Sequence, residues 1–372
     1  MINKKMQNPL TVEHLLAGTF LLGIVISYVY NGFLQSKPTN HLIAYFVTFG
    51  LFFGFINQLL NELGPSEKNV DFVLKWLTIM MVFVSCFAVA EFGVRMAIGV
   101  NIGDFLPRPF RGEYDSSTLD KFLVRVRGFT EESGQHAFIS EAFMPLCIYY
   151  LIYRTNWPGL IKGGLIGLLI VSFLLAFSAG ALVALGLALG VMGAYYFVFR
   201  RISVGTIFKL VIGVLVAYLA ILALLDIDLF ATLYAIVEAK LNGGGSLNDR
   251  SSRMDEFWIA YLPQPIYHKL LGFGPSGFRI LGLEKSILSL YPTFMNEGGI
   301  ISLSTFLLFL TYTFWTIVRI EGVAKLFLLV SFVACVVHYI AVADYFRPWF
   351  WFFTALVFFI SRVESEAKIA KV

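Results

Sequence analysis

Long apolar runs, each about as long as a helix that crosses a bilayer, occupy most of this sequence. A helix of roughly 20 apolar residues spans the ~30 Å hydrocarbon core of a membrane. The chain has 372 residues, is 58% hydrophobic and has a mean hydropathy of +0.78. These features predict an all-α polytopic integral membrane protein with about ten transmembrane helices, at 14–34, 41–60, 74–96, 136–153, 160–177, 180–199, 208–229, 297–318, 323–342 and 348–362.

One apolar run is too long for a single crossing. Gly159–Phe199 contains 41 residues, and Ser178-Ala179-Gly180 is its natural break. Two long connections separate the predicted helices, and the second contains apolar and aromatic clusters of its own. The chain then divides into 1–96 with three transmembrane helices, 97–135 as a first long external loop, 136–229 with four helices, 230–296 as a second, partly helical loop subdomain, and 297–372 with three helices and a cytoplasmic tail.

The distribution of basic residues predicts the orientation. If the N-terminus is cytoplasmic, fourteen lysines and arginines lie on cytoplasmic segments, whereas the two short external turns hold only Lys37 and Arg347. Cytoplasmic loops carry such an excess. We therefore expect a multi-pass protein of the cytoplasmic (inner) membrane with both termini cytoplasmic and both long loops external. Connections of this length are usually functional or disordered.

Charge and cysteine content exclude several classes of partner. The net charge of +4 is spread along the connections, which favours membrane orientation and predicts no nucleic-acid partner. Cys86, Cys147 and Cys335 lie in apolar runs without metal-ligand spacing. No nucleotide-binding fingerprint is present. We expect no metal and no cofactor.

The stretch RVRGFTEESGQHAF is unusually rich in charge and lies before the fourth predicted span. It contains Arg125, Arg127, Glu131, Glu132 and His136. One interpretation is a solvated loop, with the histidine as an interfacial anchor. The other is a binding or catalytic site at the external mouth of the helix.

A second charged cluster lies in the other long loop, in NDRSSRMDEFWIAYLPQPIYHKLLGFGPSGF. It contains Arg250, Arg253 and His268, followed by the glycine turn Gly272–Gly277. The planar guanidinium group binds phosphate oxygens through two hydrogen bonds. Two external arginine clusters therefore suit an anionic lipid head group such as a pyrophosphate. The histidine alternatively snorkels toward the membrane interface.

Three further charged residues lie in or near predicted spans. Glu141 is five residues into the fourth span, and an ionisable group in a membrane helix tends to face a polar interior. Its alternative is to snorkel to the helix end. Asp344 and Arg347 bracket a short external turn, where they either form an ion pair or line a site beside the two loops.

Three segments resemble the bacterial O-antigen ligase and polysaccharide-polymerase superfamily, over roughly residues 120–320. RVRGFTEESGQHAFIS resembles the family's Arg-x-x-Gly segment, and FSAGALVALGLALG resembles its Ser-Arg-Gly-Ala helix start. SSRMDEFWIAYL, LLGFGPSGF and MNEGGIISL resemble its Arg, Trp, Gly-x-Gly and Glu-x-Gly segments. The matching positions are Arg125, Gly128, Ser178, Gly180, Ala181, Arg253, Trp258, Gly272, Gly274, Glu297 and Gly299.

The chain departs from the family pattern at two places. Ala179 stands where the family often has arginine, and Leu288-Ser289 stands where ligases carry a His-Asn pair. The second departure removes the usual ligase base and favours a polymerase.

The resemblance implies glycosyl transfer on the external face of the membrane. The expected donor is an undecaprenyl-pyrophosphate-linked oligosaccharide, and the acceptor is a hydroxyl group of a lipid-linked repeat unit. The expected partners are this substrate, membrane lipids and a chain-length regulator protein.

This chemistry assigns roles to the charged residues. Arginines can stabilise the departing pyrophosphate without a metal, and a general base assists the attacking hydroxyl. We expect Arg125 and Arg253 to bind the pyrophosphate, supported by Arg127 and Arg250. The candidate bases are Glu132, Glu131 and His136, with His268 as a more distant choice.

Two other functions stay open. A ligase would transfer a finished glycan to a lipid or protein acceptor with the same body. A polysaccharide transporter or flippase would carry charges within mid-membrane segments and broken helices in symmetric halves, whereas the charge here is concentrated in two external loops.

Overall fold

The computed structural model describes residues 11–32, 36–100, 125–199 and 246–369, and they are helical with no strand. The predicted seventh span, 208–229, lies outside the described residues. The helices are α1 (Val12–Tyr30), α2 (Ser36–Phe46) continuing through η1 (Val47–Phe55) into α3 (Ile56–Leu63), α4 (Glu67–Ile98), α6 (Ser133–Tyr149) with η3 (Tyr150–Arg154), α7 (Gly159–Leu175), α8 (Ala179–Phe199), α11 (Ser246–Tyr261), α12 (Ile266–Leu271), η4 (Gly277–Arg279), α13 (Leu290–Arg319), α14 (Ala324–His338) and α15 (Pro348–Ile369).

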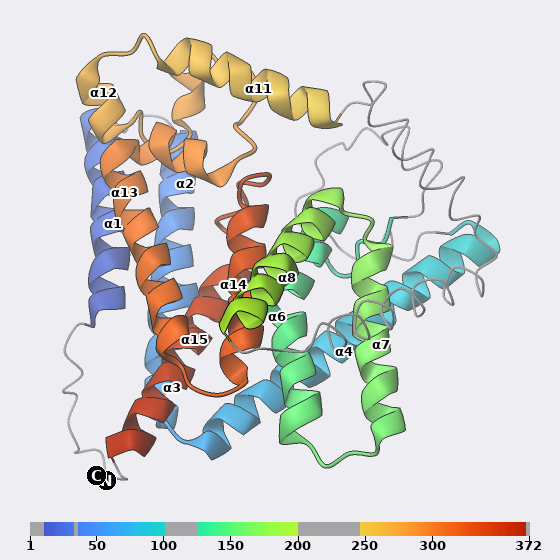
Figure 1. Cartoon of the computed structure of the whole chain (residues 1–372). Coiled ribbons are helices and arrows are strands. Elements are labelled where there is room, and N and C mark those ends of the chain that lie inside the picture. The colour runs from blue at the N-terminus through green and yellow to red at the C-terminus, as the bar shows by residue number, and fades with distance from the viewer. Residues whose placement is uncertain (1–10, 33–35, 101–124, 200–245, 370–372) are drawn as a thin grey trace.

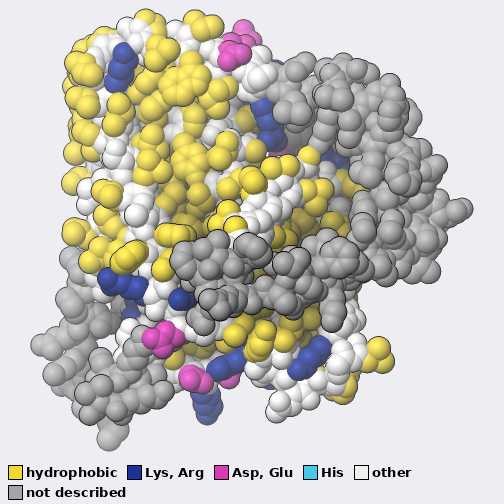
Figure 2. All heavy atoms as spheres, in the orientation of Figure 1, with side chains coloured by type: hydrophobic (Ala, Val, Ile, Leu, Met, Phe, Trp, Pro, Cys, Tyr) yellow, Lys and Arg dark blue, Asp and Glu magenta, His cyan; other side chains and the backbone are white. Residues whose placement is uncertain are grey.

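Several described helices have the length and composition of membrane spans, which indicates a membrane protein. Hydrophobic side chains cover much of the described surface between the two ends of the helices on the face shown in Figure 2, and most charged side chains lie toward those ends. The total of about ten crossings stays a prediction. Among the described residues, five helical segments are long and apolar enough to cross a membrane: Val12–Tyr30, Pro38–Leu63, Glu67–Ile98, Ser133–Arg154 and Leu290–Arg319.

Helix boundaries follow local sequence signals. The hydroxyl of Ser66 caps the start of α4 by accepting a hydrogen bond from Asn69 N, and Gly99 ends the helix in the left-handed conformation (φ 69°). The predicted break between the fifth and sixth spans is present, because α7 ends at Leu175 and α8 begins at Ala179. With 32 residues, α4 is about 48 Å long, and it runs obliquely to its neighbours in Figure 1.

Two helices begin earlier than the apolar runs suggest. α6 begins at Ser133 rather than at 136, and α13 begins at Leu290 rather than at 297. Both therefore extend into the segments 97–135 and 230–296 that were predicted to be loops. Polar residues in these first turns, such as His136 and Glu297, are buried and bonded to other side chains. These turns can therefore be helical although they are not apolar.

The two ends of the helical body carry different elements. The start of α1 and the last turns of α15 meet at one end, where Arg362 Nη1 lies 3.2 Å from Glu13 Oε1; we call this the terminal end. α11, α12 and the connection between α14 and α15 lie at the opposite end, the loop end (Figure 1). Which end faces the cytoplasm stays a prediction.

Aromatic packing holds the central helices together. The ring of Phe20 on α1 lies 4.8 Å from those of Phe49 and Phe294, and Trp351 on α15 lies 4.2 Å from Phe49. Tyr45 stacks on Tyr345, with ring centroids 4.3 Å apart. Buried aromatic pairs contribute beyond their area. The connection that carries Tyr345 is thereby fixed to the helical core.

Candidate functional site

The connection between α14 and α15 joins the two charged stretches predicted from the sequence. Arg347 Nη2 donates a hydrogen bond of 2.6 Å to Glu131 Oε2, in the stretch before α6. Arg250 Nη1, on α11, donates a hydrogen bond of 2.8 Å to the carbonyl oxygen of Ala341. Residues from the first and second predicted loops therefore meet at one short turn.

A half-buried carboxyl group lies in this turn. Asp344 is hydrogen-bonded to the side chain of Gln135, on the first turns of α6, and lies near Glu132, His338 and Arg347. Burial raises the pKa of Asp344, the nearby Glu132 raises it further, and Arg347 opposes the shift. We call Glu131, Glu132, Gln135, Arg250, Asp344 and Arg347 the loop-end cluster.

Beneath this cluster, a buried acid contacts a buried histidine. Glu141 Oε2, on α6, lies 2.5 Å from Nδ1 of His338, at the end of α14, and both side chains are buried. A carboxylate on Nδ1 fixes the tautomer and orientation of an imidazole ring. The prediction that Glu141 faces a polar interior rather than snorkelling to the surface is therefore confirmed, and its partner was not predicted.

The Arg-x-x-Gly turn is held by an acid that the sequence analysis missed. Buried Glu91, on α4, accepts hydrogen bonds through Oε2 from the backbone nitrogens of Arg127 (3.1 Å) and Gly128 (2.8 Å). Gly128 has φ 57°. Val126 N also donates to Leu175 O at the end of α7. The backbone between Arg125 and Gly128 is thus fixed, and with it the positions of the two arginines.

His136 lies inside the protein rather than at a membrane interface. It is fully buried, and its Nε2 lies 2.9 Å from Ser172 Oγ on α7. A Cβ on Gly128 would lie 3.0 Å from His136 Nδ1, so the ring packs directly under the Arg-x-x-Gly turn. The interpretation as an interfacial anchor is wrong, because the turn covers the ring. This packing supports a structural role.

The two arginines of α11 have different partners. Arg253 Nη2 forms an ion pair of 2.6 Å with Asp249 Oδ2, and Nη1 donates to Ser286 O at 3.3 Å. Lys285 shares the same aspartate, and the hydrogen bond from Arg253 lowers the pKa of Asp249. Arg250, one turn earlier, reaches the loop-end cluster. The structure therefore brings Arg250 to the cluster, while Arg253 is held beside it on the same helix.

His268 lies apart from the loop-end cluster. Its ring stacks on Phe273, with centroids 4.5 Å apart, and contacts Tyr30 at the end of α1. His268 is on α12, which follows the C-terminal end of α11 and lies above α1 and α13 in Figure 1. Arg250 is near the N-terminal end of α11. The structure does not bring His268 together with the other predicted bases.

The two glycine motifs form one structural joint. Phe273 N donates to Asn296 O and Gly274 N donates to Glu297 O, at 2.7 and 3.0 Å. A Cβ on Gly272 would lie 2.5 Å from Gly299 N. Gly299 itself has φ 68° and kinks α13. The glycine turn after α12 is therefore seated on the kink of α13, and both backbones approach closely because neither carries a side chain there.

Glu297 completes this joint. Its buried carboxyl group accepts hydrogen bonds from Tyr45 Oη (2.5 Å) and Ser276 N (2.9 Å). Gly272 O accepts a hydrogen bond from the side chain of Asn31, directly after α1, and Gly274 N donates to Ser27 Oγ on α1. These contacts fix the end of the second loop to the membrane-embedded helices, so the joint positions α11 rather than providing reactive groups.

The described residues contain no group of three or more His, Cys, Asp or Glu side chains that could hold a metal ion. Comparisons of the chain with protein-family profiles, with characterised proteins and with solved structures give no match. Function is therefore argued from the loop-end cluster itself.

Proposed function

We propose that the chain is a polysaccharide polymerase, of the O-antigen, exopolysaccharide or capsule type, that joins undecaprenyl-pyrophosphate-linked repeat units on the external face of the cytoplasmic membrane. The observation that carries the proposal is the meeting of the two arginine-bearing segments at the turn that holds Asp344. Glycosyl transfer from a lipid pyrophosphate needs cationic groups and a base together at a membrane surface.

In this reaction the acceptor hydroxyl oxygen forms a bond to the anomeric carbon of the donor sugar, and the bond from that carbon to the pyrophosphate oxygen breaks. The proton of the hydroxyl passes to the base, and the pyrophosphate lipid leaves with the electron pair. Arg125, Arg127, Arg250 and Arg253 would stabilise the charge that develops on the leaving group.

We assign the role of general base to Asp344 rather than to Glu132, which lies beside it. A general base works best when its pKa lies near the working pH, and burial and Glu132 shift the pKa of Asp344 in that direction. Glu131 is less suited, because its carboxylate is already paired with Arg347. His136 is less suited because it is buried under Gly128.

Reconstitution tests the proposal. The purified chain in lipid would receive the undecaprenyl-pyrophosphate repeat unit of its host without nucleotide or metal, and the products would be sized on a gel. We expect a ladder that Arg250→Ala abolishes. Arg279→Ala is the matched control, because Arg279 follows α11 in the same segment and its guanidinium lies over the ring of Phe278, outside the loop-end cluster. Transfer of a whole glycan to a lipid or protein acceptor, without a ladder, would instead support a ligase.

The buried Glu141–His338 pair favours a second candidate, a proton-coupled polysaccharide transporter. Ionisable groups inside membrane helices often mark proton pathways. A transporter predicts that Glu141→Gln abolishes movement of glycan across a vesicle membrane and that the reconstituted chain forms no ladder. A polymerase predicts the ladder and no such movement.

A further inference from the structure

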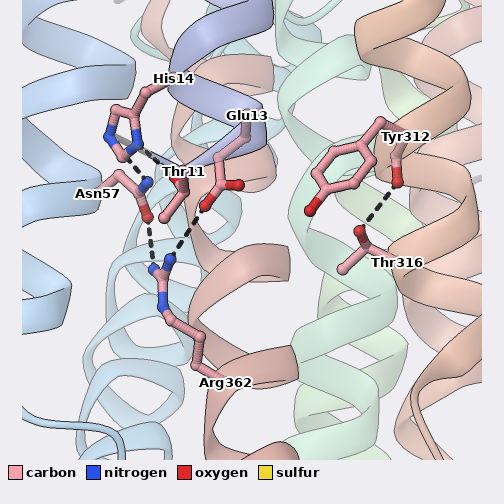
Figure 3. Close-up of polar contacts among 7 residues, drawn as sticks. All are labelled: Thr11, Glu13, His14, Asn57, Tyr312, Thr316 and Arg362. Carbon is pink, nitrogen blue, oxygen red and sulfur yellow. Dashed lines mark hydrogen bonds and ion pairs between the residues drawn. The ribbon is translucent and has the colours of Figure 1, made fainter. Parts of the chain in front are cut away.

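At the terminal end, far from the loop-end cluster, the described residues form an open cleft of about 660 Å³. It lies between the start of α1, the end of α13 and the last turns of α15, and Figure 3 shows part of its wall. Its lining residues are Thr11, Val12, Glu13, Tyr312, Trp315, Thr316, Arg319, Ile320, Phe358, Ser361, Arg362, Glu364 and Ser365.

Two lining residues of the cleft, Glu13 and Arg362, belong to a polar network that joins three helices. Arg362 Nη1 donates to Glu13 Oε1 at 3.2 Å, and Nη2 donates to Asn57 Oδ1 at 2.6 Å. Nε2 of His14 lies 3.2 Å from Asn57 Nδ2, and Figure 3 shows these side chains converging from α1, α3 and α15. The Nε atom of Arg362 is buried and has no hydrogen-bond partner among the described residues.

The second arginine of the cleft is Arg319. The guanidinium of Arg319 lies 4.9 Å from the centre of the Trp315 ring, and it forms no ion pair with any described residue. Of the two acids of the cleft, Glu13 accepts a hydrogen bond from Arg362, and Glu364 accepts one from the backbone nitrogen of Glu321 at 2.7 Å. The exposed guanidinium of Arg319 therefore presents N–H groups that can bind phosphate oxygens.

The surroundings of the cleft are those of a membrane interface. Phe314 and Trp315 are 42% and 51% exposed at the end of α13, and Val12 and Leu15 are exposed on α1. Tryptophan beside arginine at the end of a membrane helix is typical of the head-group level. If an anionic lipid binds here from the bilayer, its acyl chains would contact these apolar side chains.

We propose that this cleft binds the phosphate group of an anionic membrane lipid, with the guanidinium of Arg319 as the donor, the Arg362 guanidinium at the wall of the cleft and Trp315 beside the glycerol region of the lipid. This site is independent of the proposed glycosyl transfer, since it lies at the opposite end of the helices.

The test uses the purified full-length chain in detergent. Its Tm and the lipid that it retains, measured by native mass spectrometry, would be followed on addition of phosphatidylglycerol, phosphatidylcholine or inorganic phosphate. We expect phosphatidylglycerol to stabilise the chain more than the other two. Arg319→Gln should require about fivefold more phosphatidylglycerol for the same effect, since one basic group near a lipid surface contributes about that factor.

Lys325→Gln is the matched control, because Lys325 is a basic residue at the same end, in the first turn of α14, but does not line the cleft. It should respond as the unchanged chain does. Trp315→Leu provides a second, uncharged variant and should also weaken retention of the lipid. Arg362 is left unchanged, because its removal would leave Glu13 buried without its partner.

Three results would overturn the proposal. An unchanged response of Arg319→Gln would show that the lipid acts elsewhere. Equal stabilisation by phosphatidylcholine would remove the requirement for an anionic lipid. Equal stabilisation by inorganic phosphate, lost in Arg319→Gln, would assign the cleft to a soluble anion instead.

Discussion

The loop-end cluster and the wall of the terminal-end cleft are both built from arginines and carboxyl groups, but they balance charge differently. At the terminal end, Glu13, Asn57 and Arg362 lie on helices, and the one acid of this trio is paired with its one arginine. At the loop end, Asp344 and Glu132 lie close together, and Glu131 forms an ion pair with Arg347.

This difference has chemical consequences. The ion pair of Glu13 with Arg362 contributes to the fold, whereas burial and the nearby Glu132 raise the pKa of Asp344, so that this acid holds its proton more strongly than an exposed carboxyl group does. The terminal end is therefore suited to stability and to holding an anion. The loop end is suited to moving a proton.

The largest effect should come from Asp344→Asn, which keeps the size of the side chain but removes the base. We expect polymerisation in the reconstituted assay to fall about 10²–10⁴-fold, the usual contribution of a general base, with little change in Tm. Glu256→Gln, at an exposed position of α11, is the control and should retain the rate. A normal rate for Asp344→Asn would contradict the assignment of proton transfer to the loop end, and with it the proposed difference between the two ends.

The next effect tests how the loop end is assembled. In Gly272→Ala the new Cβ would lie 2.5 Å from Gly299 N, whereas a Cβ on Gly282 would meet nothing within 4 Å, and both glycines have positive φ (79° and 75°). In both variants the alanine is strained by the positive φ, so the difference between their free energies of unfolding reports the steric clash at Gly272. We expect Gly272→Ala to lower the free energy of unfolding by about 1–3 kcal/mol more than Gly282→Ala.

The polymerisation rate of Gly272→Ala per folded molecule should fall as well, because the joint positions α11 and Arg250. Lipid binding at the terminal end should not change. Loss of both functions together would mean that the two ends are not independent.

A smaller effect on stability is expected at the terminal end. Glu13→Ala leaves Arg362 half-buried without its acid, and we expect the free energy of unfolding to fall by roughly 2 kcal/mol. The double variant Glu13→Gln, Arg362→Met removes both charges and should recover part of the loss. The polymerisation rate per folded molecule should stay normal. A selective loss of rate in Glu13→Ala would contradict the assignment of this network to stability.

Much of the helical layout could be predicted because apolar runs report membrane helices directly. The break at Ser178-Ala179-Gly180 was predicted and is present between α7 and α8. The starts of α6 and α13 were not, because their first turns contain polar residues such as His136 and Glu297. These side chains are buried against Ser172 and Tyr45, and no apolar pattern indicates that.

The candidate site was predicted only in part, for a related reason. The charged residues of the external segments were identified from their density, and Asp344 and Arg347 from their position in a turn. Glu91 and His338 were missed, although each is an ionisable residue in or beside a predicted span, as Glu141 is. Their partners lie 36 and 197 residues away in the chain, and a single sequence does not tell which helices pack together.

The smallest expected effect is a dependence on pH that has opposite signs for rate and stability at the loop end. Because the pKa of Asp344 is higher in the folded chain than in the unfolded chain, the unfolded chain releases this proton first as the pH rises. The contribution of Asp344 to stability is therefore greatest below its ordinary pKa and falls as the pH rises through the raised value.

The polymerisation rate should rise over the same interval, because the base becomes unprotonated. Rate and Tm measured across this range should thus diverge in the unchanged chain, and the divergence should vanish in a chain with Asp344→Asn that retains measurable activity. A rate and a Tm that rise together would identify another group as the base.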